Sequence, residues 1–300
     1  MNSSIDMKTL GVIKAVYNQE HLVEDIGQNI KDCATEGLRF YIRDDFSSDR
    51  TFEALKELCL SNTVINQNSE NVGIRANDAR LLAECATDYI TFSAGDDFLH
   101  SEGLSEVMSV LNTESPDIVI TKLLRVPESD ALRISKLRSL HLTPQSEEIL
   151  MRHREVFART WSSATQFLET AAVLPGLVWT QGMIVRTDLA KAAGYLPDGD
   201  VDDWGLLHNL AVCSRGTRLK LVFVDKVFAV LGANPKSLGS DCEKQFCSQV
   251  QAVERFWDPI LRKEALLNVV KKKVKLFSEI DVDADGVFRA FGEAFRSTSE

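Results

Sequence analysis

Three pairs of adjacent aspartates stand out because each pair follows a predicted strand or opens a predicted helix. The pairs are Asp44-Asp45, Asp96-Asp97 and Asp202-Asp203. Carboxylates at the carboxyl edge of a parallel sheet can accept hydrogen bonds from a base or ribose, and they can hold a hard divalent cation that neutralises a diphosphate. A carboxylate held apart from the cation can act as a general base. Each pair alone is more typical of a turn or a helix cap, but their joint placement favours a functional site.

The predicted secondary structure of the first half places two of these pairs at one edge of a sheet. Apolar β-rich runs alternate with helical patterns along this half. Strands are predicted at 11–16, 39–42, 63–66, 88–92 and 117–121, and helices at 22–33, 52–59, 74–85 and 104–111. This strict alternation predicts an α/β fold with a mostly parallel sheet covered on both faces. Ligands of such sheets bind beyond the carboxyl ends of the strands.

The pattern changes in the second half of the chain. Residues 125–170 are rich in Arg, Ser, Glu and His and have helical spacing, which predicts a helical insertion. Strands are predicted again at 182–186 and 219–231, with a helix between them that begins at the acidic run 200–204. After about residue 240 the chain is predicted to be helical.

Composition limits the classes of protein to which the chain can belong. Its 300 residues are 44% hydrophobic, which is ordinary for a globular protein with a substantial core. A formal net charge of -10 argues against a general nucleic-acid binder, because such a protein needs a basic surface. The six cysteines contain no C-x-x-C pair and are expected to be buried thiols in a reducing compartment.

The sequence also bears on location. No apolar run approaches the ~20 residues of a membrane span, and the N-terminus lacks the layout of a signal peptide. We therefore expect a cytoplasmic protein. The basic run 271–275 lies in a partly amphipathic helix. This helix either contacts anionic lipid peripherally, on the inner face of the membrane, or forms a solvated face.

Four segments, taken in order, resemble the family 2 glycosyltransferases and their GT-A-type fold. The resemblance runs from about Val12 to Leu210 and is weaker between 125 and 179. The segments are VIKAVYNQE from Val12, RDDFSSDRT from Arg43, ENVGIRANDARLLAECATDYITFSAGDDFL from Glu70, and QGMIVRTDLAKAAGY from Gln181 followed by DVDDW. Their order and spacing make the match specific, although each segment alone would be a weak signal.

The resemblance implies both a fold and a reaction. It implies a GT-A-type, Rossmann-like, mostly parallel central sheet flanked by helices over 1–235, with a C-terminal helical extension at 236–300. The first unit divides into a nucleotide-sugar-binding half, 1–122, and an acceptor-side half with the insertion, 123–235. The implied enzyme moves a single hexosyl or N-acetylhexosaminyl group, with inversion, from a nucleotide-diphosphate sugar, expected to be a UDP-sugar. The implied acceptor is a hydroxyl of a glycan or lipid-linked saccharide, in surface polysaccharide or lipid-linked oligosaccharide synthesis.

The resemblance also implies roles for particular residues. Asp96 and Asp97 are expected to contact Mn²⁺ or Mg²⁺. Asp203 matches the catalytic base that deprotonates the acceptor hydroxyl, and Asp202 is the reserve candidate. The residues expected near the nucleotide are Ala15, Val16, Tyr17, Asp44, Asp45, Arg75 and Asn77.

The sequence departs from the family pattern at several positions. Ala94 stands where the first acid of the metal-binding D-x-D motif is usual, so the cation is expected to depend on Asp96 or Asp97 with more water ligands. Phe46 stands where a glycine is usual, at the rim of the expected nucleotide pocket. Arg75 is displaced by one position from the usual Ala-Arg-Asn. The Gln-x-x-Arg-Trp signature of processive synthases is absent from the sequence, which favours single addition.

Two other functions remain open from the residues alone. A sugar-nucleotide nucleotidyltransferase needs a basic loop after the first strand to grip a triphosphate, and residues 16–25 contain no Lys or Arg. A catalytically silent nucleotide- or glycan-binding module is conceivable because of Ala94 and Phe46. His100 and His208 follow acidic pairs closely enough to approach the site, but surface or structural roles are favoured for both.

Overall fold

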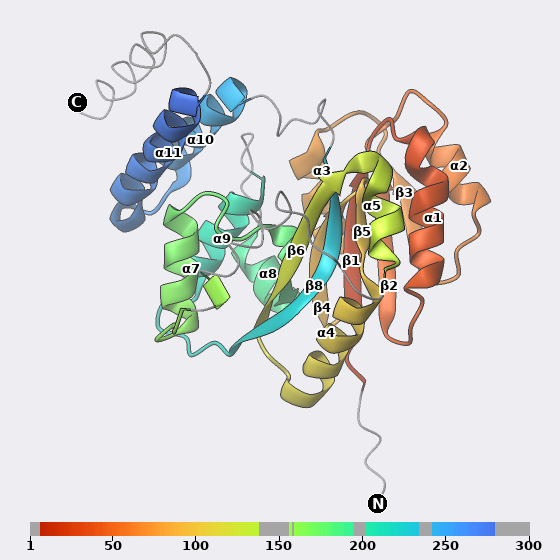
Figure 1. Cartoon of the computed structure of the whole chain (residues 1–300), viewed down its shortest axis with the longest axis horizontal. Coiled ribbons are helices and arrows are strands. Elements are labelled where there is room, and N and C mark those ends of the chain that lie inside the picture. The colour runs from red at the N-terminus through yellow and green to blue at the C-terminus, as the bar shows by residue number, and fades with distance from the viewer. Residues whose placement is uncertain (1–6, 138–155, 158, 195–201, 234–241, 280–300) are drawn as a thin grey trace, which may run out of the picture.

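An eight-stranded sheet runs through the centre of the molecule and carries helices on both faces (Figure 1). The structure is a computed structural model that describes residues 7–137, 156–157, 159–194, 202–233 and 242–279. The strand order is β3-β2-β1-β4-β7-β6-β8-β5. The strands are β1 (Leu10–Val16), β2 (Leu38–Asp44), β3 (Thr63–Gln67), β4 (Tyr89–Ala94), β5 (Asp97–Leu99), β6 (Ile118–Pro127), β7 (Met183–Arg186) and β8 (Leu221–Ala233).

The first four strands of this order form the parallel part of the sheet, as the sequence predicts. β1 pairs in parallel with both β2 and β4, and β2 pairs in parallel with β3. The register sets Val16 opposite Asp44 and Ala15 opposite Ala94. The carboxyl ends of β2, β1 and β4 therefore lie side by side at one edge, and the chain leaves that edge into the first two acidic pairs.

The remaining strands make the sheet mixed. β7 is antiparallel to both β4 and β6, and β8 is parallel to β6. β5 follows β4 after two residues but pairs antiparallel with β8, with Asp97 opposite Leu231. The sequence did not predict β5, because a three-residue strand is too short to show periodicity. It also ended β6 too early, because the β-bulges on either side of Lys122 break the alternation there.

Side chains alternate between the two faces of the strands, as strand geometry requires. Leu10 and Val12 of β1 belong to one buried core and Ile13 and Ala15 to the other. Helices α1, α2, α4 and α5 cover the first face, and α3 and α7–α11 cover the second. The helices are α1 (Val23–Asp32), α2 (Thr51–Glu57), α3 (Ile74–Glu84), α4 (Ser101–Glu114), α5 (Glu128–Ser135), α7 (Ala164–Val173), α8 (Thr187–Ala193), α9 (Asp202–Cys213), α10 (Cys242–Phe256) and α11 (Pro259–Glu279), with the short 3-10 turns η1 (Glu20–Leu22) and η2 (Thr180–Gly182).

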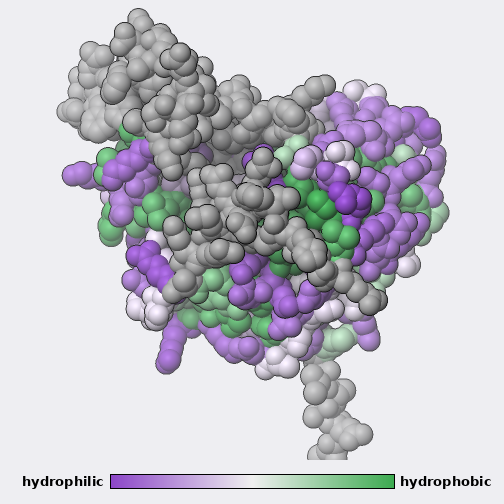
Figure 2. All heavy atoms as spheres, in the orientation of Figure 1, coloured by the Kyte–Doolittle hydropathy of each residue, from purple (hydrophilic) through white to green (hydrophobic). Residues whose placement is uncertain are grey.

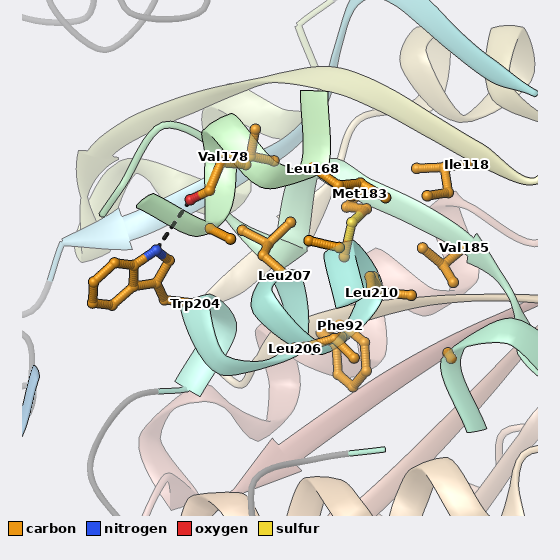
Figure 3. Close-up of a cluster of buried hydrophobic side chains, with 14 of the residues drawn as sticks. Phe92, Ile118, Leu168, Val178, Met183, Val185, Trp204, Leu206, Leu207 and Leu210 are labelled. Atoms are coloured by element: carbon orange, nitrogen blue, oxygen red, sulfur yellow. Dashed lines mark hydrogen bonds between the residues drawn. The ribbon is translucent and has the colours of Figure 1, made fainter. Parts of the chain in front are cut away.

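The second core joins the acceptor-side helices to the C-terminal helices. Trp204 at the start of α9 is buried, and its Nε1 donates to the Ala171 carbonyl of α7 at 3.0 Å (Figure 3). Its ring lies 4.5 Å from that of Trp257, and Val253 and Ala265 of α10 and α11 belong to the same core. The predicted insertion is helical at α5 and α7, and residues 138–155 lie outside the described part of the chain.

The surface agrees with the composition in most respects. Figure 2 shows hydrophilic side chains over the outer side of α1 and α2, and none of the described helices is long and apolar enough to cross a membrane. The prediction of buried thiols holds for Cys33 and Cys85 but is wrong for Cys59 and Cys213, which are exposed. Cys213 is the last residue of α9 and Cys59 lies two residues beyond α2, where the apolar spacing of a helix no longer fixes a buried face.

Candidate active site

The end of β2 is built around two buried carboxylates. Asp44 is fully buried and accepts hydrogen bonds from the backbone N–H of Ser47 at 2.9 Å, from the Ser47 hydroxyl and from Gln67 Nε2 at 2.9 Å. It therefore closes the turn that leaves the strand. Asp45 continues the ladder, because its N–H donates to the Val16 carbonyl at 2.9 Å.

Asp45 fixes the loop that leads into α3. Its carboxylate accepts from the backbone N–H of Val72 at 2.9 Å and of Gly73 at 2.8 Å, and from Asn68 Nδ2 at 2.8 Å. Gly73 has a φ of +82°, a conformation that favours glycine. The loop and the first turn of α3 are therefore held against the strand end by a charged acceptor with several donors, which is a strong arrangement.

Asn77 extends this network beneath the edge. It is fully buried, donates to the Arg43 carbonyl at 3.0 Å and accepts from Asn68 Nδ2 at 3.0 Å. Arg75 lies in the same first turn of α3 and is half-buried. The structure thus brings together the residues of β1, β2 and α3 that are predicted to bind the nucleotide. The polar side chains among them that lie beneath the edge form most of their hydrogen bonds with other groups of the protein.

A buried lysine anchors the turn between β4 and β5. Lys14 of β1 is 2% exposed, and its ammonium donates to Ser93 Oγ at 2.9 Å, to the Asp97 carbonyl at 2.8 Å and to the Ala94 carbonyl. Burial lowers the pKa of Lys14 to about 8, against the opposing charges of Asp97 and Asp96. Sequence reasoning missed this residue. The available signal was a single lysine inside an otherwise apolar strand.

The two acids of the predicted metal pair have different surroundings. Asp97 is 5% exposed, and its Oδ2 accepts from the Ala94 N–H at 2.8 Å, so this carboxylate is engaged within its own turn. Asp96 is half-buried, and burial raises its pKa, opposed by its own backbone N–H and by the charge of Lys14. Asp96 is therefore the member of the pair that keeps solvent access.

A third carboxylate, which sequence reasoning missed, lies beside Asp96. Glu128 is the first residue of α5, directly after β6, and its charge raises the pKa of Asp96. A Cβ built at Gly232 of β8 would lie 3.1 Å from Asp96 Cβ and 3.3 Å from Glu128 Cα, so only glycine lets the two acids approach. Glu128 Oε1 lies 3.3 Å from His21 Nε2, whereas the buried Oε2 has no hydrogen-bond partner among the described residues. No sequence spacing links positions 96 and 128.

The oxygens at this edge fit a hard divalent cation. Gln19 Oε1 is also buried without a partner among the described residues, and a Cβ at Gly95 would collide with it. Buried oxygens without donors are costly, and Mg²⁺ is commonly held by one or two carboxylates together with substrate phosphates. No group of three or more His, Cys, Asp or Glu side chains that could enclose a metal occurs among the described residues. A cation here would therefore need oxygens from the substrate or water as well.

The third acidic pair opens α9, as the sequence predicts, but the side chains of Asp202 and Asp203 lie outside the described part of the structure. Their role as base stays a prediction. His208, one turn later, is 4% exposed and accepts from the Asp258 N–H at 2.9 Å, and burial lowers its pKa. His100 is 2% exposed, and its Nε2 lies 2.7 Å from the Leu137 carbonyl. Both histidines therefore have packing roles.

This fold is the GT-A type found in glycosyltransferases. The family described as Glycosyl transferase family 2 matches residues 12–173, and the chain belongs to this family. It is therefore a glycosyltransferase. No curated protein sequence matches the chain significantly.

Solved structures of glycosyltransferases share the whole fold. The structure of S. aureus TarS 1–349 in complex with UDP-GlcNAc has a TM-score of 0.63 and 15% identity, over 95% of this chain and 80% of that one. The mannosyltransferase PcManGT from Pyrobaculum calidifontis, in complex with GDP-Man and Mn²⁺, has a TM-score of 0.56 and 14% identity, over 96% of this chain and 80% of that one. At these identities the similarity shows the fold.

Proposed function

We propose that the protein transfers a single hexosyl or N-acetylhexosaminyl group, with inversion, from a nucleotide-diphosphate sugar to a hydroxyl of a glycan or lipid-linked saccharide. One observation carries this proposal. The structure gathers Asp44, Asp45 and Asn77 at the same sheet edge as Asp96, next to the end of β1. In α/β sheets this edge is where ligands bind.

The donor is proposed to be a nucleotide sugar because the similar structures hold UDP-GlcNAc, UDP and GDP-Man. A UDP-sugar is proposed first, as the resemblance implies. The proposed pathway is surface polysaccharide or lipid-linked oligosaccharide synthesis on the cytoplasmic side of a membrane. Peripheral contact through 271–275 stays a prediction, because the side chains from 272 onward lie outside the described residues.

A divalent cation, Mn²⁺ or Mg²⁺, is proposed to be held at the β4–β5 turn. Asp96 is its first ligand, with Glu128 Oε2 and Gln19 Oε1 as the protein oxygens that lack donors, and Asp97 as the ligand that the sequence also predicts. When bound, the cation neutralises charge on the departing diphosphate. Lys14 holds the turn that carries Asp96 and Asp97.

The proposed base is Asp203, with Asp202 in reserve. In an inverting transfer the acceptor oxygen bonds to the anomeric carbon as the bond from that carbon to the diphosphate breaks. The base takes the hydroxyl proton. Trp204 supports this assignment because it fixes the start of α9 to α7 through its bond to Ala171.

The test is transfer by the purified protein with Mn²⁺ across a panel of UDP- and GDP-sugars and saccharide acceptors, measured as release of the nucleoside diphosphate. We expect Asp203→Asn to lower the rate by about 10²–10⁴-fold while donor binding stays within twofold. Full activity in Asp203→Asn, with loss in Asp202→Asn, would move the role to Asp202. Donor binding without transfer to any acceptor would instead favour a silent binding module.

A further inference from the structure

Phe46 has a backbone conformation that L side chains rarely adopt. Its φ is +59°, directly after Asp45 at the end of β2. The left-handed region is costly for residues with a Cβ, and a bulky residue there is a true outlier. Burial does not compensate for this strain, because the Phe46 side chain is 51% exposed. A phenylalanine kept in a strained and exposed position points to a role other than folding.

A second exposed aromatic residue lies next to it. Tyr17 follows β1 and is 47% exposed. Two hydrogen bonds join the loops that hold the two rings, one before and one after each ring. The Asp45 N–H donates to the Val16 carbonyl at 2.9 Å, and the Asn18 N–H donates to Ser47 Oγ at 2.8 Å. Tyr17 and Phe46 therefore lie in two loops that are joined at the ends of neighbouring strands, with Phe46 one residue further from its strand than Tyr17.

The remaining exposed large apolar side chains in the described part of the chain are aliphatic and lie elsewhere. They are Met7, Val64, Leu137, Ile260 and Leu267. The exposed aromatic surface of the described residues is thus concentrated at the edge where the donor is proposed to bind. Aromatic faces stack on planar bases, and such stacking tolerates any base because every base has a π-face.

The order of the strands orients the ligand. Phe46 follows β2, Tyr17 follows β1, and Asp96 follows β4, and these three strands are adjacent. Two interstrand spacings separate the ends of β2 and β4 by about 10 Å, which a nucleoside diphosphate can span. The aromatic end suits the base, and the end with Asp96 and the oxygens of Glu128 and Gln19 suits the diphosphate and its cation.

We propose that Phe46 and Tyr17 form a clamp for the nucleobase of the donor, and that the strain at Phe46 is retained because its ring binds the base. This inference rests on the proposed function and adds the residue that recognises the base. Asp44 lies at the same strand end as the clamp, and its carboxylate already accepts hydrogen bonds from the Ser47 N–H and from Gln67.

The test uses the full chain with Mn²⁺ and measures affinity for UDP, GDP and inorganic pyrophosphate by calorimetry, and the melting temperature without ligand. Phe46→Gly removes the ring and relieves the strain. Cys59→Gly is the matched control, because Cys59 is also exposed with a positive φ, +49°, but follows α2 away from the edge. Phe46→Tyr keeps an aromatic ring in place.

We expect Phe46→Gly to lower the affinity for the nucleotide by about tenfold and to leave the affinity for pyrophosphate within twofold. The melting temperature should not fall. Cys59→Gly should leave all three affinities unchanged, and Phe46→Tyr should bind the nucleotide within about threefold of the unsubstituted protein. The clamp is refuted if Phe46→Gly binds the nucleotide as the unsubstituted protein does, or loses nucleotide and pyrophosphate alike, or melts earlier. If the unsubstituted protein binds neither UDP nor GDP, the proposed function falls, and the clamp falls with it.

Discussion

The two parts of the donor edge satisfy their polar groups in different ways. At the ends of β1 and β2, the carboxylates of Asp44 and Asp45 are met by backbone and side-chain donors of the protein. At the turn between β4 and β5, Glu128 Oε2 and Gln19 Oε1 are buried with no donor among the described residues. The carboxylates of the first part are satisfied without a ligand, whereas the oxygens of the second are proposed to gain their missing partners from a cation and its diphosphate. On this proposal, folding alone shapes the nucleoside end of the site, and the substrate completes the end where the bond breaks.

The largest expected effect comes from breaking the complete part. Asp45→Ala removes the carboxylate that accepts from the N–H groups of Val72 and Gly73 and from the buried Asn68 amide. We expect the free energy of unfolding to fall by about 3 kcal/mol, because three hydrogen bonds to a carboxylate are lost together. Urea denaturation measures this loss.

The control for that variant is Asp130→Ala, which removes an exposed ion pair with Arg133. Exposed pairs contribute little, so its free energy of unfolding should fall by less than about 1 kcal/mol. Equal losses in the two variants would show that the Asp45 network does not hold the edge together.

A smaller effect is expected from Glu128→Gln in the open part. This change keeps the shape of the side chain and removes one anionic ligand, so Mn²⁺ should bind about tenfold more weakly, or about 1.4 kcal/mol. The loss of the free Mn²⁺ signal in electron paramagnetic resonance, with UDP present, measures the affinity. Asp130→Asn on the same helix should not change it. Unchanged Mn²⁺ affinity in Glu128→Gln would leave Asp96 without its proposed partner.

These contrasts also show what the sequence could foretell. The acids at 44 and 96 could be placed because each lies at or just beyond the end of a strand with a clear apolar pattern, and the parallel order brings those strand ends together. Glu128 could not be placed, because β6 continues through a bulge before it reaches the edge. Lys14 and Gln19 were missed for a related reason: their roles come from contacts with the 93–97 turn, which lies about eighty residues away in sequence.

The smallest expected effect concerns His208, on the acceptor side. Like Asp44 and Asp45, this side chain forms its hydrogen bonds within the protein. Burial lowers the pKa of His208, and the charge of Arg215 lowers it further, whereas the charge of Asp258 opposes this shift. The Asp258 N–H donates to Nε2 of the imidazole. The folded state therefore resists protonation. The contribution of the neutral imidazole to the free energy of unfolding is full above a pH of about 6.5 and is lost as the pH falls below that value.

The consequence for His208 is measurable as a difference in melting temperature. The unsubstituted protein should lose more of its melting temperature than His208→Gln when the pH falls from about 7.5 to about 5.5. Other titrating groups shift both proteins alike, so the comparison isolates the imidazole. Parallel losses would mean that His208 titrates in the folded protein as it does in the unfolded chain.

The most direct test of the whole site is calorimetry of UDP-GlcNAc and GDP-Man with the unsubstituted protein, first in Mn²⁺ and then in EDTA. If the nucleoside binds at the β1–β2 end without a metal, and the oxygen cluster needs a cation, one nucleotide sugar should bind in both conditions, with an affinity at least about tenfold higher in Mn²⁺. Equal affinity in Mn²⁺ and EDTA would contradict the cation site at Asp96 and Glu128. Failure of a wider panel of nucleotide sugars to bind in either condition would contradict the proposed function itself.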